Sequence, residues 1–424
     1  MIEVVLLAVV VLLVLRAPIF VALGAPAILY LELKGTPIAL APQRMGGTID
    51  ESILLAVPMF LLAGRLMNLY GATERIFDFA QAIVGHIRGG LGYVAVLASM
   101  IFSAMSGSAA ADAVGVGTIT VKEMRERGYD PSFAAAVTLG SATLAPVVHP
   151  SIIMIIYGAT ANVSIGKMFL GGVVPGLLMA AGLMITVGVL SWKRGYPKGD
   201  AFSIRRVFKT MWRAALVLGT PVLIIGGIFS GVFTPTEASV VAVVYVVVIG
   251  LIYGKLEWRG FFHAVVGTGT AVGALMIVVS ISGVDAWVIA REQIPTMLAA
   301  AMTDAFTAKI VAFVAILLLG LFLGFFMDAT PIILMVVPVI MPIVQAFNID
   351  PVHLGVLFCI VCVIGLITPP VGVALYGVAM VSKLSIEKVF WATIPFFVLL
   401  IGSIIVLILV PDLVLFLPNA VITQ

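Results

Sequence analysis

Long apolar runs recur from one end of the chain to the other, and they restrict its fold more than any other feature. Many of them approach or exceed the roughly 20 residues that a helix needs to cross a bilayer. Hydrophobic residues make up 62% of the 424 residues and charged residues only 10%, and the mean hydropathy is +1.25. A transmembrane β-barrel shows short segments of alternating polarity instead. We therefore expect an all-α polytopic membrane protein without a soluble domain.

The apolar runs predict about ten spans, which places both termini on the same, outer side of the membrane. The expected spans are 2–15, 17–33, 51–71, 132–160, 168–191, 214–231, 234–254, 264–283, 352–381 and 390–412. The apolar start of the chain has no preceding basic region or small-residue cleavage site, so we read it as a retained span. Forty-two glycines and 22 prolines exceed what plain spanning helices need. Transporters use such residues to break helices where the backbone lines a site.

A basic segment marks the middle of the chain. Residues 192–213 contain seven lysines and arginines and a single carboxylate, Asp200. The positive-inside rule places this linker in the cytoplasm. A surface helix that binds anionic membrane lipids explains the same charges equally well as a local role.

Two further apolar stretches, 89–121 and 309–346, are each interrupted by polar residues. The first contains M-S-G-S-A-A-A-D from Met105 to Asp112, and the second contains F-M-D-A-T-P from Phe326 to Pro331. Basic residues flank both ends of the first stretch, which predicts a re-entrant helical hairpin entering from the cytoplasm. The number of spans requires the second hairpin to enter from the opposite side.

A shift of 220 positions aligns the two halves of the chain. Asp130-Pro131 then matches Asp350-Pro351, and Pro150 and Pro175 match Pro370 and Pro395. The halves cross the membrane in opposite directions, so we predict two inverted-topology repeats, residues 1–191 and 214–424.

Each half is also expected to contain a broken helix, at 132–160 and 352–381. The interruptions read L-A-P-V-V-H-P-S from Leu144 and G-L-I-T-P-P-V-G from Gly365. Proline removes a backbone donor and clashes with the preceding turn, so carbonyl oxygens become free at mid-membrane. With the hydroxyls and carboxylate of Ser106, Ser108, Asp328, Thr330 and Thr368, these oxygens suit sodium, and half-helix N-termini would attract an organic anion. Two proline kinks without ligands are the alternative.

Individual polar residues carry different expectations. Asp328, at a hairpin tip, is the preferred intramembrane ligand. Asp112 is either a ligand or the residue that caps and orients its tip, and Glu237 is explained by helix capping with Thr234 or Thr236. His149 could bind substrate, donate to a freed carbonyl, titrate, or be purely structural. His86, His263 and His353 are expected near the membrane surfaces, and the C-x-x-C pair Cys359 and Cys362 as buried packing residues.

Several segments together resemble a known family. They are V-P-M-F-L-L-A-G from Val57, G-H-I-R-G-G-L from Gly85, F-S-A-M-S-G-S-A-A-A-D-A from Phe102, R-G-Y-D-P-S-F-A-A-A-V from Arg127, F-T-P-T-E-A from Phe233, M-D-A-T-P from Met327 and T-P-P-V-G from Thr368. In order and spacing they resemble the large membrane subunit of tripartite ATP-independent periplasmic (TRAP) transporters. This is the DctM-like family of the ion transporter superfamily, and the likeness covers essentially the whole chain.

The resemblance implies a sodium-driven importer of carboxylates or sulfonates in the bacterial inner membrane. It also implies elevator-type scaffold and transport domains, a small four-helix membrane subunit and a soluble periplasmic binding protein; no nucleic-acid partner is expected. Two sodium ions are expected. The residues that resemble one sodium site of the family are Ser106, Gly107, Ser108, Pro146 and His149. Those that resemble the other are Asp328, Thr330, Gly365, Thr368 and Pro369. Substrate contacts are expected from Ser108, His149, Ser151 and Thr330.

The chain departs from the family pattern at one position. His149-Pro150-Ser151 stands where the family commonly has a proline pair before the serine, and the histidine could mark a preference for a particular anion. Two alternatives to the tripartite importer stay open. One is a sodium and organic-anion symporter of similar architecture that works alone. The other is an intramembrane enzyme, which we regard as the weaker reading because the metal-binding residue types are scattered.

Overall fold

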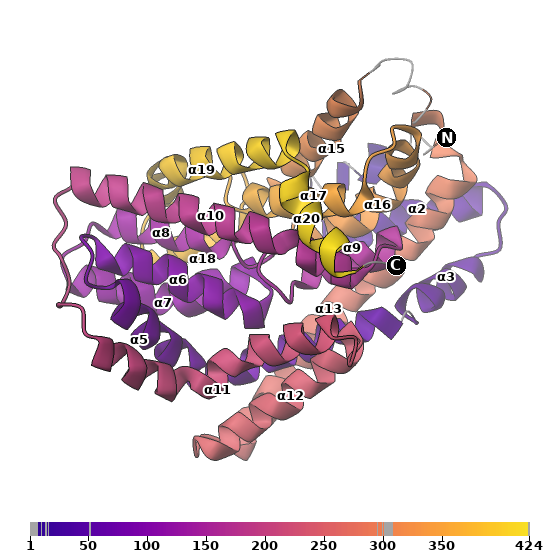
Figure 1. Cartoon of the computed structure of the whole chain (residues 1–424). Helices are drawn as coiled ribbons and strands as arrows, with labels where there is room; N and C mark the ends of the chain where they lie inside the picture. The colour runs from indigo at the N-terminus through magenta and orange to yellow at the C-terminus, as the bar shows by residue number, and fades with distance from the viewer. Residues whose placement is uncertain are drawn as a thin grey trace.

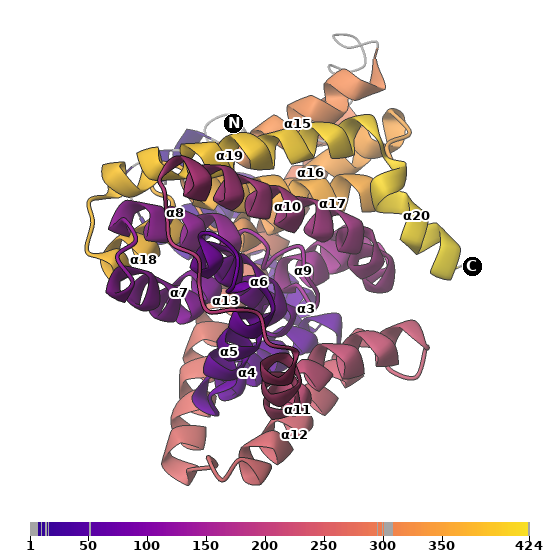
Figure 2. The same ribbon diagram turned by 60° about the vertical axis from the view of Figure 1, so that its left-hand side comes forward.

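The chain folds into helices that are arranged as a bundle with a second group of helices beside it (Figures 1 and 2). The computed structural model describes residues 7–9, 11–12, 15, 17–50, 52–294, 296–298, 300 and 308–422. Apart from one isolated bridge between Arg88 and Lys198, the regular structure of these residues is helical. The helices are α2 (Ile19–Leu33), α3 (Leu40–Ile49), the 3-10 helix η1 (Ser52–Leu55), α4 (Ala56–Leu69), α5 (Ala72–Val84), α6 (Gly90–Ser106), α7 (Ala109–Glu126), α8 (Pro131–Ala142), α9 (Ile152–Ala161), α10 (Ile165–Lys193), α11 (Ile204–Phe229), α12 (Pro235–Ile252), α13 (Trp258–Arg291), α15 (Lys309–Gly324), α16 (Ala329–Ala346), α17 (Pro351–Leu366), α18 (Val373–Ser382), α19 (Ile386–Leu409) and α20 (Asp412–Val421).

Seven helical stretches in the described part of the chain are long and apolar enough to span a membrane. They are Ser52–Leu69, Ile165–Lys193, Ile204–Phe229, Pro235–Ile252, Trp258–Arg291, Ala329–Ala346 and Ile386–Leu409. Seven shorter apolar helices accompany them, including α9 of the first expected broken helix and both pieces, α17 and α18, of the second. The expected all-α polytopic membrane protein is therefore confirmed. Most of the expected first span, 2–15, lies outside the described residues.

Several helix bounds differ from the expected spans. Helix α11 begins at Ile204, inside the segment expected as a linker, and not near residue 214. Charged residues lower the hydropathy of this segment, but lysine and arginine are good helix formers, and the Ser203 hydroxyl caps the helix by accepting from the Arg206 N–H at 3.4 Å. Helix α13 extends on both sides of the expected 264–283. Helices α3 and α20 were not expected, because each has only 10 residues.

Two pairs of helices form hairpins at the expected stretches. Helix α6 ends at Ser106 and α7 starts at Ala109, and the chain turns at Gly107 with a φ of 59°. Only glycine adopts this left-handed backbone without steric cost. Helices α15 and α16 form the second hairpin, whose connection runs from Phe325 to Asp328.

Two helices are broken at the expected prolines. In the first, α8 ends at Ala142 and α9 starts at Ile152; in the second, α17 ends at Leu366 and α18 starts at Val373. The starts of α8 and α17 are 220 positions apart and have the same cap. The Asp130 carboxylate accepts from the Ser132 N–H at 2.7 Å, and that of Asp350 accepts from the Val352 N–H at 2.8 Å.

The two halves of the chain interlock through these elements. Helix α7 of the first hairpin contacts α18, and α16 of the second hairpin contacts α9. Likewise, α8 contacts α19 and α10 contacts α17. Under the shift of about 220 positions, each contact of the first half has a counterpart with the roles exchanged. The division into residues 1–191, 192–213 and 214–424 stays a prediction.

Helices α11, α12 and the N-terminal part of α13 lie beside this bundle in both views (Figures 1 and 2). Helix α4 contacts α12 and α13, while α5 contacts both α11 and α6. Helix α5 therefore joins the first hairpin to the neighbouring group.

Candidate ion and anion site

The tip of the first hairpin is fixed by a carboxylate. The hydroxyls of Ser103 and Ser106, on α6, donate to the two oxygens of Asp112 on α7. The Asp112 side chain is only 1% exposed, and a buried carboxylate without donors would be very costly. The Ser108 N–H lies 3.5 Å from the Ser106 hydroxyl oxygen, at the limit of a hydrogen bond. Of the two expected roles of Asp112, this geometry supports the one that orients the tip.

The same tip lies against the first broken helix at van der Waals distance. A Cβ atom on Gly107 would come within 2.7 Å of the Pro150 carbonyl oxygen and 3.2 Å of the Ile152 nitrogen. On the other side, a Cβ atom on Gly64 of α4 would lie 3.2 Å from the Cα atom of Ser106. Glycine at both positions lets three backbone segments approach closely, which is how membrane helices pack when lipid removes the hydrophobic driving force.

The first break frees several carbonyl oxygens from backbone hydrogen bonding within the described part of the chain. Its last hydrogen-bonded turn ends at Val148, whose N–H donates to the Leu144 carbonyl at 2.9 Å. The carbonyl oxygens from Pro146 to Pro150 accept no backbone hydrogen bond from the residues that the structure describes. Such oxygens in an apolar protein are ready ligands for a hard cation.

His149 does not point at the hairpin tip. Its ring stacks on Phe169 of α10 at a centroid distance of 4.9 Å, and it is 2% exposed. A Cβ atom on Gly172 would come within 2.4 Å of the imidazole Cε1. Neither ring nitrogen has a hydrogen-bond partner among the described residues. The structure thus places the ring between α10 and the break, and it supports the structural role among those considered.

The other residues expected at the first site have separate positions. Ser151 is fully buried and caps α9, since its hydroxyl accepts from the Met154 N–H at 3.4 Å. Pro146 is buried within the break. Sodium or substrate ligation by either residue stays a prediction.

The second hairpin tip has an accessible carboxylate. Asp328 caps α16 by accepting from the Ala329 N–H at 2.7 Å, and its side chain is exposed. Thr330, in the first turn of α16, is 8% exposed. Asp328 and Asp112 therefore differ: the first is open to a ligand, whereas serine hydroxyls already bind the second.

Backbone hydrogen bonds join this tip to the second broken helix. The Phe325 carbonyl accepts from the Val371 N–H at 3.0 Å and from the Gly372 N–H at 3.4 Å. The carbonyl oxygens from Leu366 to Val371 accept no backbone hydrogen bond from the described residues. The N-terminus of α18 follows directly, and its positive dipole end favours a negatively charged group.

Glycines bring the second hairpin and its broken helix together. A Cβ atom on Gly365 would lie 2.5 Å from the Cα atom of Gly324, so Gly365 is a packing residue as well as an expected ligand. The Thr368 hydroxyl donates to the Ile364 carbonyl at 3.0 Å, and Pro369 is half-buried. In each half, therefore, the structure brings the hairpin tip next to the break of the same repeat.

No three side chains of histidine, cysteine, aspartate or glutamate come together as a metal site in the described part of the chain. The donors available at both tips are carbonyl, hydroxyl and single carboxylate oxygens. This donor set fits sodium better than a transition metal. Cys359 and Cys362 are free thiols and are buried, as expected for packing residues.

The remaining expectations have mixed outcomes. Glu237 forms a capping box with Thr234, whose N–H and hydroxyl donate to its carboxylate at 2.8 and 2.9 Å. His263 is exposed, as expected. His353 is not solvated, because it is 6% exposed, stacks on Phe313 and bonds through Nε2 to the Leu407 carbonyl at 2.9 Å. Its position near a membrane surface stays a prediction. His86 is half-buried, with its ring against Phe202.

Sequence reasoning missed two buried polar residues. Ser103 lies one turn before Ser106 and completes the coordination of Asp112. Asp285, on α13, is 9% exposed, and its Oδ2 has no partner among the described residues. A carboxylate within a spanning helix indicates a functional residue. Asp285 was missed because the expected span ended at residue 283.

Paired hairpins, paired broken helices and interlocking repeats define a multi-pass helical membrane protein of the kind that moves solutes. The family model of the "Tripartite ATP-independent periplasmic transporter, DctM component" matches residues 6–413. The chain belongs to this family. Three of its relatives, SiaM, YiaN and DctM, are named as transporter permeases and not as enzymes.

Two relatives show how far the similarity extends. The sialic acid TRAP transporter large permease protein SiaM of Vibrio cholerae is 45% identical over 95% of this chain and 93% of the relative. The 2,3-diketo-L-gulonate TRAP transporter large permease protein YiaN of Escherichia coli is 35% identical over 92% of both chains.

A solved structure has a similar fold. The YdaH transporter of Alcanivorax borkumensis, described as having an unusual topology, aligns with a TM-score of 0.65 over 88% of this chain and 87% of that one. At 14% sequence identity, this likeness concerns the fold alone.

Proposed function

We propose that the chain is the large membrane subunit of a sodium-coupled importer of small organic anions, which a periplasmic binding protein delivers. The observation that carries the proposal is the contact of each hairpin tip with unwound backbone whose carbonyl oxygens accept no backbone hydrogen bond from the described residues. Sodium is a cargo ion here, held at each tip by carbonyl and hydroxyl oxygens, with Asp328 at the second tip. The N-termini of α9 and α18 provide positive dipole ends for a carboxylate.

The substrate class follows from these donors and from the relatives. Both relatives are named for acidic sugar derivatives that carry a carboxylate, so such acids are the first substrates to test. Ser108 and Thr330, next to the tips, are the proposed contacts. His149 packs on α10 and Ser151 caps α9. Either residue would therefore affect substrate binding indirectly, by shaping the backbone between α8 and α9. The words tripartite and periplasmic in the family name support two partners, which we propose are a small four-helix membrane subunit and a soluble binding protein.

An elevator movement is the proposed mechanism, in the bacterial inner membrane. The two hairpins and broken helices interlock, and they would move as one body against α4 and α11–α13. Helix α16 contacts α13 in the present arrangement. A cross-link between α13 and α16 should therefore stop uptake, and reduction should restore it, whereas a link between α13 and α2 should be tolerated.

The inverted orientation of the repeats has support from α13. Thr48, on α3, lies against Gly283 near one end of this helix, while residues 255–263 lie at its other end. Gly283 is separated from residues 258–263 by roughly 30 to 37 Å of helix at 1.5 Å per residue, about the hydrocarbon thickness or more. Accessibility labelling should therefore find residues 34–50 and 255–263 on opposite sides of the membrane, with both termini periplasmic.

The decisive experiment is uptake into proteoliposomes. The chain is reconstituted with its small subunit, and a binding protein loaded with sialic acid or 2,3-diketo-L-gulonate is added outside. We expect uptake with an inward sodium gradient and none when potassium replaces sodium. Equal uptake without the binding protein would favour the symporter that works alone, and equal uptake with a proton gradient only would overturn sodium coupling.

A further inference from the structure

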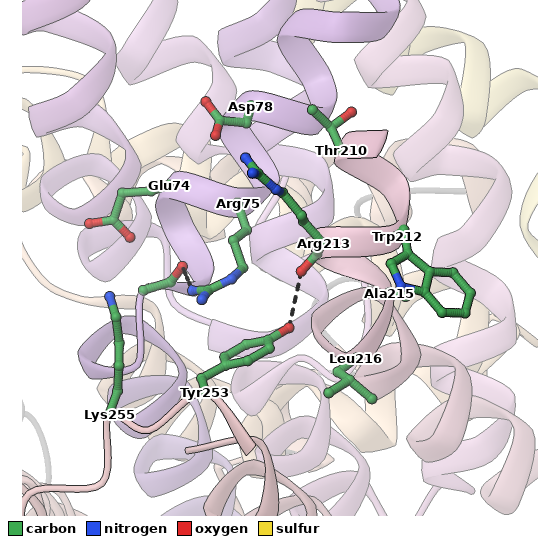
Figure 3. A pocket seen from close by; sticks show the side chains of 11 residues that line it. Glu74, Arg75, Asp78, Thr210, Trp212, Arg213, Ala215, Leu216, Tyr253 and Lys255 are labelled. Carbon is green, nitrogen blue, oxygen red and sulfur yellow. Dashed lines mark hydrogen bonds between the residues drawn. The ribbon is translucent and has the colours of Figure 1, made fainter. Parts of the chain in front are cut away.

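An open pocket of about 750 Å³ lies away from the hairpin tips, where α5, α11 and the end of α12 meet (Figure 3). Three cationic side chains line it, Arg75, Arg213 and Lys255, together with the carboxylates of Glu74 and Asp78. None of these five groups forms an ion pair within 4.0 Å in the described part of the chain. A pocket that gathers unpaired charges of both signs is suited to a ligand that carries both signs.

The charged groups occupy defined places in the pocket. The side chain of Arg213 extends from α11 toward Asp78, whereas Lys255 lies on the opposite side near Glu74 (Figure 3). Arg75 is held between them: it donates to the Gly71 carbonyl at 2.8 Å and stacks on Tyr253 at 3.8 Å. The Tyr253 hydroxyl donates to the Arg213 carbonyl at 3.1 Å, which ties the end of α12 to α11. The walls are therefore preorganised.

Gly71 makes room for these charges. Its φ is 76°, and a Cβ atom there would come within 2.6 Å of the Lys255 Nζ, 3.0 Å of an Arg75 nitrogen and 3.2 Å of a Glu74 oxygen. Three charged ends thus converge on a residue without a side chain. Any larger residue would fill this corner of the pocket.

The surroundings place the pocket at the depth of lipid headgroups. Trp212 is 82% exposed and Trp258 is 69% exposed, and exposed tryptophans mark the membrane interface. The exposed apolar side chains of Ile204, Phe208, Met211 and Trp212 share one face of α11, with basic residues beside them. With 26 residues, α11 is about 39 Å long, so one end extends beyond the hydrocarbon layer.

We propose that this pocket binds the headgroup of an aminophospholipid such as phosphatidylethanolamine. The phosphodiester would accept from Arg213 and Lys255, and the primary ammonium would donate to Glu74 or Asp78. The acyl chains would lie along the apolar surface of α11 that follows Leu216 toward the C-terminal end of the helix. An anionic headgroup without an ammonium would give neither carboxylate a cationic partner, so the presence of both signs in the pocket favours the zwitterionic lipid. By the positive-inside rule, the lipid belongs to the cytoplasmic leaflet.

Thermal unfolding of the delipidated full-length chain in detergent tests the proposal. Phosphatidylethanolamine should raise the unfolding midpoint by several degrees more than phosphatidylglycerol or phosphatidylcholine with the same acyl chains. Mass spectrometry should find it as the main co-purifying lipid. Inorganic phosphate at the same concentration should have no effect. Equal shifts with phosphatidylglycerol or with inorganic phosphate would overturn the proposal.

Substitutions of the lining residues test whether the lipid-dependent shift in the unfolding midpoint arises from this pocket. Arg213→Gln with Lys255→Gln should abolish the preference for phosphatidylethanolamine, and Glu74→Gln with Asp78→Asn should transfer it to phosphatidylglycerol. Lys209→Gln is the matched control, because Lys209 lies on the same basic segment of α11 but does not line the pocket. Unchanged selectivity in both double variants would contradict the assignment. Headgroup selectivity of the unmodified chain remains decisive if a variant fails to fold.

Discussion

The Gly107 Cα atom and the Pro150 carbonyl are so close that no side chain fits between them. A Cβ atom on Gly107 would lie 2.7 Å from that oxygen, and the φ of Gly107 is 59°. The tip of the first hairpin therefore directly contacts the unwound backbone between α8 and α9. Two backbone segments without intervening side chains form the first candidate ion site.

Gly107→Ala should consequently disable transport. A side chain in the left-handed conformation costs about 1–2 kcal/mol, and the clash with Pro150 must push the tip away. We expect sodium-driven uptake to fall by at least about tenfold, since a misplacement of 1 Å at a functional site can cost about a hundredfold. Gly226→Ala is the control, because a Cβ atom there meets no atom within 4 Å. Normal uptake by Gly107→Ala would show that the close contact is not needed.

Asp112→Asn should destabilise the hairpin tip without removing a sodium ligand. Both carboxylate oxygens accept from serine hydroxyls, and hydrogen bonds to a charged group contribute about 1.5–3 kcal/mol. The midpoint of thermal unfolding should fall by the same amount with and without sodium. Asp412→Asn, at the exposed start of α20, should leave it unchanged. If Asp112→Asn instead abolished the sodium-dependent part of the stability, Asp112 would be a ligand.

His149 and Gly172 should show coupled effects on stability. Gly172→Ala places a methyl group 2.4 Å from the imidazole and 2.7 Å from the Val147 carbonyl, and overpacking costs about 1–3 kcal/mol. His149→Ala removes the first clash but not the second, so the double variant should recover only part of the loss. Gly269→Ala, with open space around it, is the control. Additive effects of the two substitutions in a double-mutant cycle would contradict this contact.

A pH-dependent contact joins α2 to the end of α13. The Glu292 carboxylate accepts from the Tyr30 hydroxyl and pairs with Lys34 at 2.9 Å, and these hydrogen bonds lower the pKa of Glu292 below its ordinary value. A lowered pKa means that the contribution to stability is complete above the ordinary pKa of about 4.3–4.5 and is lost as the pH falls through the lowered value.

Glu292→Gln should therefore lower the unfolding midpoint at pH 7, and the difference from the unmodified chain should vanish in more acidic solution. The effect should be small, because the pair is accessible to solvent. Glu257→Gln, at the other end of α13, provides the comparison. A difference that persists unchanged below pH 4 would mean that charge on Glu292 does not hold the contact.

The hairpins and broken helices were predictable because each is marked by residues that are costly in a membrane. Pro146, Pro150, Pro369 and Pro370 cannot continue a helix, and Ser106, Asp112 and Asp328 would not occur in apolar runs without partners. The shift of 220 positions also aligned Asp130 with Asp350, which the structure shows to be equivalent helix caps. These signals are local, so a single sequence contains them.

The orientation of individual side chains could not be predicted in this way. His149 turns toward α10 because Gly172 leaves space there, and that space depends on two segments more than 20 residues apart. Asp112 is satisfied by Ser103, a residue that looked like any other small residue of α6. The start of α11 was misplaced because hydropathy measures burial in lipid, while helix formation also tolerates the charged residues before it.

The contacts of α7 with α18 and of α16 with α9 also have a consequence for biosynthesis. The chain is made from its N-terminus, so α7 and α9 enter the membrane long before their partners exist. The faces that contact these partners stay uncovered until more than 150 further residues have been translated and inserted. The first hairpin can therefore reach its final packing only when the ribosome has delivered α18, residues 373–382, which makes assembly of this protein a late event in its own synthesis.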